Sequence, residues 1–154
     1  MDDTFDLQRF VDAQDSVYQR VLLELRAGRK ESHWMWFIFP QLKGLGHSAM
    51  ALRYGIASRE EAEAYLRHPL LGPRLNKCTE LVNLVEGRSV EHIFGYPDHL
   101  KFHSSMTLFA VVAPEEKIFA TALQKYFAGQ PDQATITALT SPLSSKTSSS
   151  PAKT

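Results

Sequence analysis

Residues 98–113 read DHLKFHSSMTLFAVVA, and this stretch decides the fold class. Its second half is apolar on almost every side and contains Val111 and Val112, so a buried strand is one interpretation. We expect a helix, because Asp98 is placed to cap one directly after Pro97 and no second strand pattern lies nearby. The sequence therefore predicts an all-α fold, a single compact domain of several short packed helices.

The flanking segments carry apolar residues at helical spacing, with recognisable starts and stops. The short polar residues Asp6, Ser58, Ser89 and Asp132 are placed to cap helices, and Glu61 follows Ser58 at the spacing of a capping box. Glycine or proline lies near the end of most of these segments. Helices are expected at residues 6–14, 15–28, 58–69, 73–87, 89–95, 98–113, 114–129 and 132–139.

Length and composition bound the possibilities further. A chain of 154 residues can bury one continuous core, and we expect that domain at residues 5–139. Residues 140–154 are mostly Ser, Thr, Pro and Lys, so they cannot offset the entropy of ordering and are expected to form a disordered tail. The single cysteine, Cys78, excludes an intrachain disulfide and is expected in the core.

Charge and hydropathy argue against two classes of partner. The 17 basic and 17 acidic residues leave no net charge, whereas nucleic-acid-binding domains usually carry a basic excess. The longest strictly apolar run covers residues 34–39, far short of the roughly 20 needed to span a bilayer. The acidic start of the chain does not resemble a signal peptide. We expect a cytoplasmic protein that binds neither nucleic acid nor membrane.

Residues 30–54, KESHWMWFIFPQLKGLGHSAMALRY, hold the strongest candidate for a binding site. A two-glycine turn runs into an expected helix start, where backbone N–H groups favour an anion such as phosphate. Lys43 and Arg53 add positive charge, and an aromatic ring could stack on a base. The candidate ligand-binding residues are His33, Trp34, Trp36, Gln41, Lys43, Gly44, Gly46, Ser48, Arg53 and Tyr54.

A second interpretation of the same segment stays open. The aromatic run is then core, Pro40 ends a short helix, and the glycines form a tight turn. The functional counterpart is a non-catalytic domain that docks another protein. No pattern names a reaction, so no catalytic residue is assigned and enzyme activity is left undecided.

The histidines raise the question of a metal site. His99 and His103 are four residues apart, the spacing that two zinc ligands on one helix use. No Glu lies between them, Lys101 is close by, and no second Cys or His cluster completes a ligand set. We therefore expect no metal and no cofactor.

Several longer motifs carry a resemblance. The runs SHWMWFIFPQLKGLG, RYGI, HPLLGPRL and FGYPDHLKFHSSMTLF resemble the bacterial family of unknown function catalogued as eighteen-ten, whose members are often labelled calpastatin. The resemblance covers roughly residues 5–139 and implies an all-α fold without an established activity. The order of motifs is also similar to that of YbiA-like domains, which implies an ADP-ribose or NAD derivative as the phosphate-bearing metabolite.

Overall fold

The computed structural model describes residues 3–140, and within them the chain forms ten helices and no strand. The all-α prediction is confirmed. The helices are α1 (Gln8–Asp15), α2 (Tyr18–Arg26), α3 (Met35–Ile38), α4 (Ala49–Tyr54), α5 (Arg59–Arg67), α6 (Leu71–Leu84), α7 (Val90–Phe94), α8 (Asp98–Val112), α9 (Lys117–Phe127) and α10 (Gln133–Thr140). The tail predicted at residues 140–154 lies outside the described residues from 141 onward.

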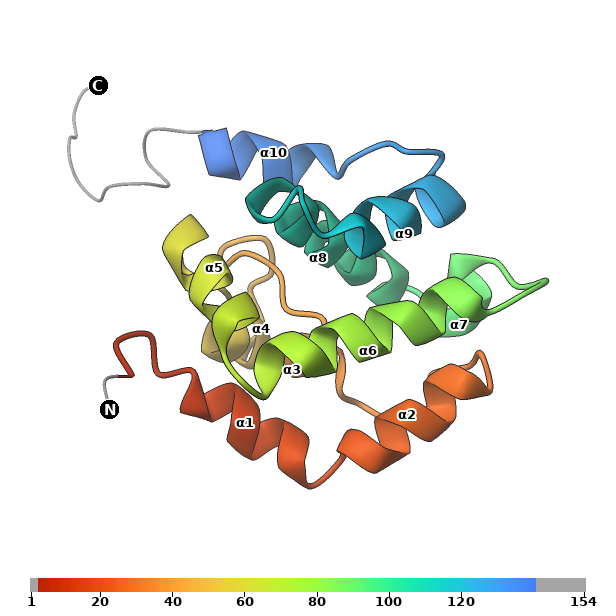
Figure 1. Cartoon of the computed structure of the whole chain (residues 1–154), viewed down its shortest axis with the longest axis horizontal. Coiled ribbons are helices and arrows are strands. Elements are labelled where there is room, and N and C mark those ends of the chain that lie inside the picture. Colours follow the sequence, from red (N-terminus) through yellow and green to blue (C-terminus); the bar gives the residue numbers. More distant parts are fainter. Residues whose placement is uncertain (1–2, 141–154) are drawn as a thin grey trace.

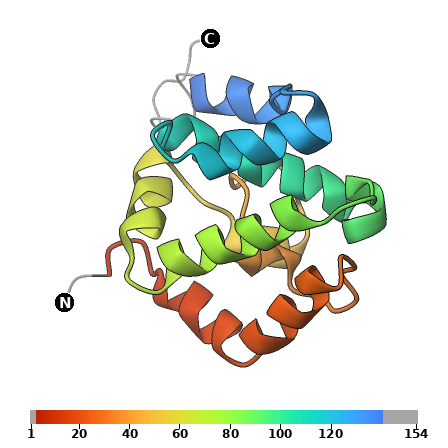
Figure 2. The ribbon, with the colours of Figure 1, turned by 45° about the vertical axis from the view of Figure 1, so that its right-hand side comes forward.

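Helix α8 is the centre of the fold and packs against α3, α5, α7, α9 and α10. Because neighbours surround it, the stretch from Met106 to Phe109 is buried on every side, and this explains its strand-like apolar composition. The strand interpretation of residues 106–113 was wrong. Figure 1 shows α6 running between the α1–α2 pair and the α8–α9 pair, and Figure 2 shows the same order from another side.

Aromatic side chains form much of the core. Phe94 and Phe102 stack with ring centroids 4.7 Å apart, and Phe39 meets Phe102 edge to face at 5.0 Å. Trp34 is fully buried beside Phe39. Rings in such arrangements contribute about 0.5–1.5 kcal/mol per pair beyond the area that they bury.

Three of the predicted helix caps are confirmed. The side-chain oxygens of Ser58, Ser89 and Asp132 accept hydrogen bonds from backbone N–H groups three residues on, each at 3.1 Å. Each bond satisfies an N–H group that the first turn of a helix leaves without a partner.

Two other predicted caps were wrong. Asp98 is the first residue of α8, not its cap, and its carboxylate lies 2.7 Å from Lys30 Nζ. Asp6 lies outside α1 with φ at +53°, and the carboxylate of Asp3 accepts from the N–H groups of Leu7 and Gln8 instead. The Asp98 carboxylate is thus engaged by Lys30 and does not cap α8. At the start of α1, Asp3 takes the place of Asp6.

Some predicted boundaries also differ. Helix α2 starts at Tyr18, later than Asp15 or Ser16, and α6 starts at Leu71, ahead of Pro73. The ring nitrogen Nδ1 of His68 accepts from the N–H groups of Leu70 and Leu71, so a histidine performs the capping at the start of α6. Within residues 3–140, no helix is long and apolar enough to cross a membrane.

Candidate functional site

The ten predicted ligand-binding residues do not come together in one site in the structure. Lys43 and Arg53 line one surface hollow, whereas Gln41 and Gly46 line a different one. The remaining six do not line either hollow. They are His33, Trp34, Trp36, Gly44, Ser48 and Tyr54.

The rings that were expected to stack on a ligand belong mainly to the core. Trp34 is fully buried, and its indole N–H donates to Glu24 Oε1 at 2.9 Å. Tyr54 is buried with its ring 5.3 Å from that of Phe37. Trp36 is half-buried against the same core. The stacking role proposed for Trp34 or Tyr54 therefore does not fit their positions.

The other three residues either serve the local backbone structure or have no described contact. Ser48 caps α4 by accepting from the N–H of Ala51 at 3.1 Å. Gly44 has φ at +102°, a conformation that favours glycine, so it serves the turn. His33 is exposed in the loop before α3.

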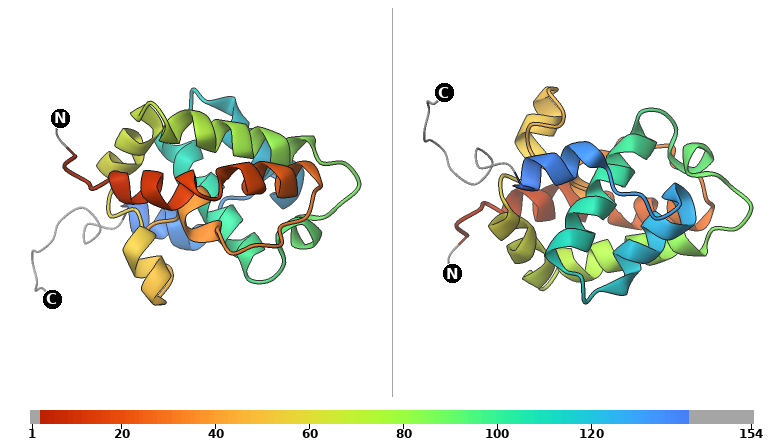
Figure 3. Two further views of the ribbon diagram at one scale, coloured as in Figure 1. Left: turned by 90° about the horizontal axis from the view of Figure 1, so that it is seen from below. Right: turned by 90° about the horizontal axis from the view of Figure 1, so that it is seen from above.

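A short β-bridge explains why Lys43 and Arg53 line the same hollow. Leu42 and Ile56 form a single parallel bridge, in which Lys43 N–H donates to Ile56 O at 2.8 Å. Gly55 passes so close that a Cβ there would lie 2.7 Å from the Cα of Lys43. Residues 43–55 therefore form a closed loop that contains α4, and Figure 3 shows this helix projecting from the body.

Arg9 fixes the surroundings of this loop. Its guanidinium has five N–H donors, and each has an acceptor at 2.7–3.0 Å. Four acceptors are backbone carbonyls and the fifth is the carboxylate of Glu61. The carbonyls belong to Phe5, Asp6, Arg53 and Gly55. The Arg9 side chain thus joins the N-terminal segment, the end of α4 and helix α5.

These contacts enclose a hollow of about 540 Å³, which we call the Arg9 hollow. It is lined by Thr4, Phe5, Asp6, Arg9, Lys43, Leu52, Arg53, Ala57 and Glu61. Among the described residues, no hydrogen bond or ion pair engages the Lys43 ammonium or the Asp6 carboxylate. Arg53 uses only Nε, which donates to Tyr54 Oη at 3.2 Å. Two cations and one carboxylate are therefore available to a ligand here.

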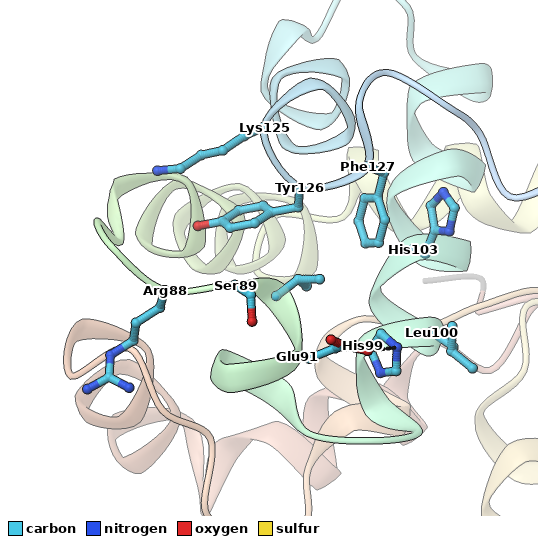
Figure 4. A pocket seen from close by; sticks show the side chains of 10 residues that line it. Arg88, Ser89, Glu91, His99, Leu100, His103, Lys125, Tyr126 and Phe127 are labelled. Carbon is cyan, nitrogen blue, oxygen red and sulfur yellow. Dashed lines mark ion pairs between the residues drawn. The ribbon is translucent and has the colours of Figure 1, made fainter.

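A cleft of about 580 Å³ lies between α7, α8 and α9 (Figure 4). Most of its polar groups are occupied by the protein itself. Lys125 Nζ donates to the carbonyls of Asn83 and Val85 at the end of α6, both at 2.6 Å. Tyr126 Oη donates to Val82 O, and burial, assisted by Glu86, raises the pKa of Tyr126 to about 12. We call this the α8 cleft.

A smaller hollow of about 300 Å³ contains Gln41 and Gly46 and is also lined by residues of α8 and α10. Ser104 Oγ donates there to Asp132, the same carboxylate that caps α10. Lys101 is 3.6 Å from Asp98. The charged groups of this hollow thus already have partners, and the Arg9 hollow offers the most unoccupied charge of the three.

No group of three or more His, Cys, Asp or Glu side chains in residues 3–140 is arranged to hold a metal ion. His99 Nε2 lies 3.5 Å from Glu91 Oε2, and Nδ1 lies 3.3 Å from Gly95 O. His103 Nε2 lies 2.7 Å from Gln130 O. Protein oxygens therefore lie beside both ring nitrogens of His99 and beside Nε2 of His103.

The sequence interpretation missed three residues that define the Arg9 hollow. Arg9 was not singled out, because its partners Arg53, Gly55 and Glu61 are far away in sequence, and Asp6 was considered only as a helix cap. Gly55 does follow Tyr54 in the run RYGI, and a glycine directly after a short helix is a usable signal for close backbone approach.

The comparisons with known proteins agree with this fold and do not name an activity. The crystal structure of the conserved hypothetical protein Rv1873 from Mycobacterium tuberculosis matches with 60% sequence identity and a TM-score of 0.88. The match covers 89% of this chain and 98% of that one. No curated protein matches the chain. The likeness to YbiA-like domains finds no support. The sequence model described as "Protein of unknown function (DUF1810)" matches residues 4–139, and the chain belongs to that family.

Proposed function

We propose that this protein binds a small phosphate-bearing metabolite in the Arg9 hollow. One observation carries the proposal: Lys43 and Arg53, which come from opposite ends of a closed loop, line one hollow. No described residue engages the Lys43 ammonium, and Arg53 uses only Nε, which donates to Tyr54 Oη. A lysine supplies a point charge, and the two terminal nitrogens of a guanidinium match the spacing of phosphate oxygens.

The surroundings support retention of such a ligand. Arg9 is neutralised by Glu61 at 2.9 Å and uses all its donors, so it holds the hollow in shape and does not compete for the phosphate. A volume of about 540 Å³ is within the range of roughly 300–1,000 Å³ that small-molecule sites occupy. Phe5 and Leu52 provide apolar surface at the same hollow.

The finer choice of ligand is an ADP-ribose or NAD derivative. Two phosphates can engage Lys43 and Arg53 together, while Phe5 and Leu52 supply apolar contact for the remainder. Because Trp34 and Tyr54 are buried, this choice does not depend on stacking against either ring. Binding should weaken as salt rises, since both cations are exposed.

Thermal unfolding with a ligand panel tests the proposal. ADP-ribose, NAD, AMP, inorganic phosphate and an unphosphorylated nucleoside are compared. A ligand at a hundredfold excess over Kd stabilises by about 2.7 kcal/mol. For a domain of this size, that raises Tm by roughly 5–10 °C. The phosphorylated compounds should raise Tm and the nucleoside should not.

Matched variants locate the binding. Lys43→Ala and Arg53→Ala should reduce the ligand-induced shift without lowering Tm in the absence of ligand. Arg88→Ala removes an exposed cation from the α8 cleft and should leave the shift unchanged. A panel without any shift at millimolar concentration would contradict the proposal, as would a shift lost only in Arg88→Ala.

Docking of a protein partner is the second candidate, and a different observation favours it. Tyr96, in the turn before α8, is 81% exposed, and Leu100, in the first turn of α8, is 47% exposed. Exposed apolar side chains grouped in this way are typical of interaction surfaces. If the whole ligand panel fails, this face is the part of the described chain where a partner should be sought.

A further inference from the structure

His103 lies on α8 at the wall of the α8 cleft and is held by two neighbours (Figure 4). Its Nε2 is 2.7 Å from the carbonyl oxygen of Gln130. Because a carbonyl can only accept, Nε2 carries the proton in this contact. The ring also lies flat against Phe127, with centroids 3.9 Å apart and planes within 5°. The imidazole is therefore fixed in both orientation and tautomer.

The consequence is a free lone pair on Nδ1. In the neutral ring only one nitrogen carries a proton, so fixing that proton on Nε2 leaves Nδ1 unprotonated. Among the described residues, no group donates to this nitrogen. The half-buried ring lines a cleft of about 580 Å³, which leaves room for a reacting group beside it.

The other five histidines differ from His103, and all of them lie within the described part of the chain. His68 and His92 use Nδ1 in contacts at the starts of helices, and His99 has an oxygen beside each ring nitrogen. No described contact orients His33 or His47. Only His103 combines one nitrogen held by a carbonyl with a second nitrogen left free.

The cationic groups of the cleft lie on the side away from His103 (Figure 4). Arg88 lines this cleft, and among the described residues its guanidinium has no hydrogen-bonded partner. Lys125 is already bound to the carbonyls of Asn83 and Val85. Glu91 is directed towards His99, as the dashed contact in Figure 4 shows. The reactivity of His103 therefore rests on the orientation of its ring, since an oriented nitrogen with a free lone pair is a nucleophile.

We propose that His103 is a phosphorylation site, at which Nδ1 accepts a phosphoryl group from a small phosphoramidate or acyl phosphate donor. The Nδ1 lone pair attacks phosphorus, the bond from phosphorus to the leaving group breaks, and that group departs with its electron pair. With phosphoramidate, which reacts in the form protonated on nitrogen, the leaving group is ammonia. Nε2 keeps its proton throughout and donates to Gln130 O, so the phosphorylated ring stays in place. This site is separate from the Arg9 hollow and does not depend on it.

Incubation with potassium phosphoramidate tests the proposal directly. Intact-mass spectrometry at alkaline pH should show the gain of one phosphoryl group, and peptide mapping should place it on His103. ³¹P NMR should identify the Nδ1-linked isomer. Equal labelling of the freely exposed His33 and His47 would overturn the proposal, as would an Nε2 linkage or no labelling.

A matched variant separates reactivity from folding. In His103→Gln the side-chain amide can still donate to Gln130 O, but no nucleophilic nitrogen remains. This variant should keep the wild-type Tm and lose the labelling. His92→Gln removes an exposed histidine from α7 and should keep it. Labelling that persists in His103→Gln would refute the assignment even if the total mass gain were as expected.

Discussion

Replacement of Arg9 by methionine is the most direct test of the framework around the Arg9 hollow. The Arg9 side chain is 13% exposed and that of Glu61 is 3% exposed, so the pair is almost fully removed from water. Arg9→Met keeps a side chain of similar length and apolar stem but leaves the Glu61 carboxylate without its cation. Four backbone carbonyls lose a donor at the same time.

The size of the effect follows from these contacts. Removing one partner of a buried ion pair typically destabilises a protein by about 3–5 kcal/mol. Exposed carbonyls such as that of Arg53 can be hydrated, so their loss adds little to this range. Domains are stable by roughly 5–15 kcal/mol, so the variant should fold with much of its stability gone.

Urea unfolding followed by circular dichroism measures the loss. With a slope of about 2 kcal/mol/M, the midpoint should fall by about 1.5–2.5 M. Glu61→Gln in the Arg9→Met background removes the unpaired charge and should recover part of the stability, with a coupling energy above roughly 1 kcal/mol. A loss below about 1 kcal/mol, or strictly additive effects in the double variant, would refute the reasoning.

Three further predictions rest on other contacts. Gly55→Ala should destabilise by about 1–3 kcal/mol, because the new Cβ would lie 2.7 Å from Lys43 Cα and the loop must move; an unchanged urea midpoint would be inconsistent with that contact. Partial burial alone would raise the pKa of Glu24, but hydrogen bonds from Ser32, Glu31 N–H and Trp34 lower it to about 2 from its usual 4.5. The depressed pKa means that Glu24 stabilises the fold above pH 4.5 and that this contribution is lost as pH falls towards 2. The stability difference between wild type and Glu24→Gln should shrink over that window in acid titrations. Burial raises the pKa of Cys78 to about 12, so a thiol reagent at pH 8 should label it only as fast as the protein unfolds; immediate labelling of the native protein would show the thiol to be accessible.

Sequence reasoning succeeded where a feature depends on near neighbours. Ser58, Ser89 and Asp132 cap their helices because the N–H group that each satisfies is three residues away. The helical state of residues 98–112 was predictable for a related reason. Once the run is helical, its uninterrupted apolar character indicates a central helix with neighbours on every side.

Sequence reasoning failed where a side chain is engaged by a partner that is distant in sequence. The Asp98 carboxylate pairs with Lys30 across 68 positions of sequence, and nothing local to Asp98 signals that partner. The aromatic segment shows the same limit. Trp34 is buried with its indole N–H donating to Glu24, whereas the sequence alone left both a buried and a ligand-facing tryptophan open.

The candidate site shows why residue types alone are insufficient for function. Lys43 and Arg53 were predictable as cations near a glycine turn, and the structure does bring them to one hollow. What distinguishes them from Lys125 or Lys101 is that no described carboxylate or carbonyl already binds them, and this depends on partners elsewhere in the fold. Arg9 contacts residues 44, 46 and 52 positions away. No local sequence pattern therefore indicates that the Arg9 side chain shapes the hollow. Whether a polar group is available to a ligand is therefore a property of the folded chain, and in this protein it selects the Arg9 hollow over a larger cleft.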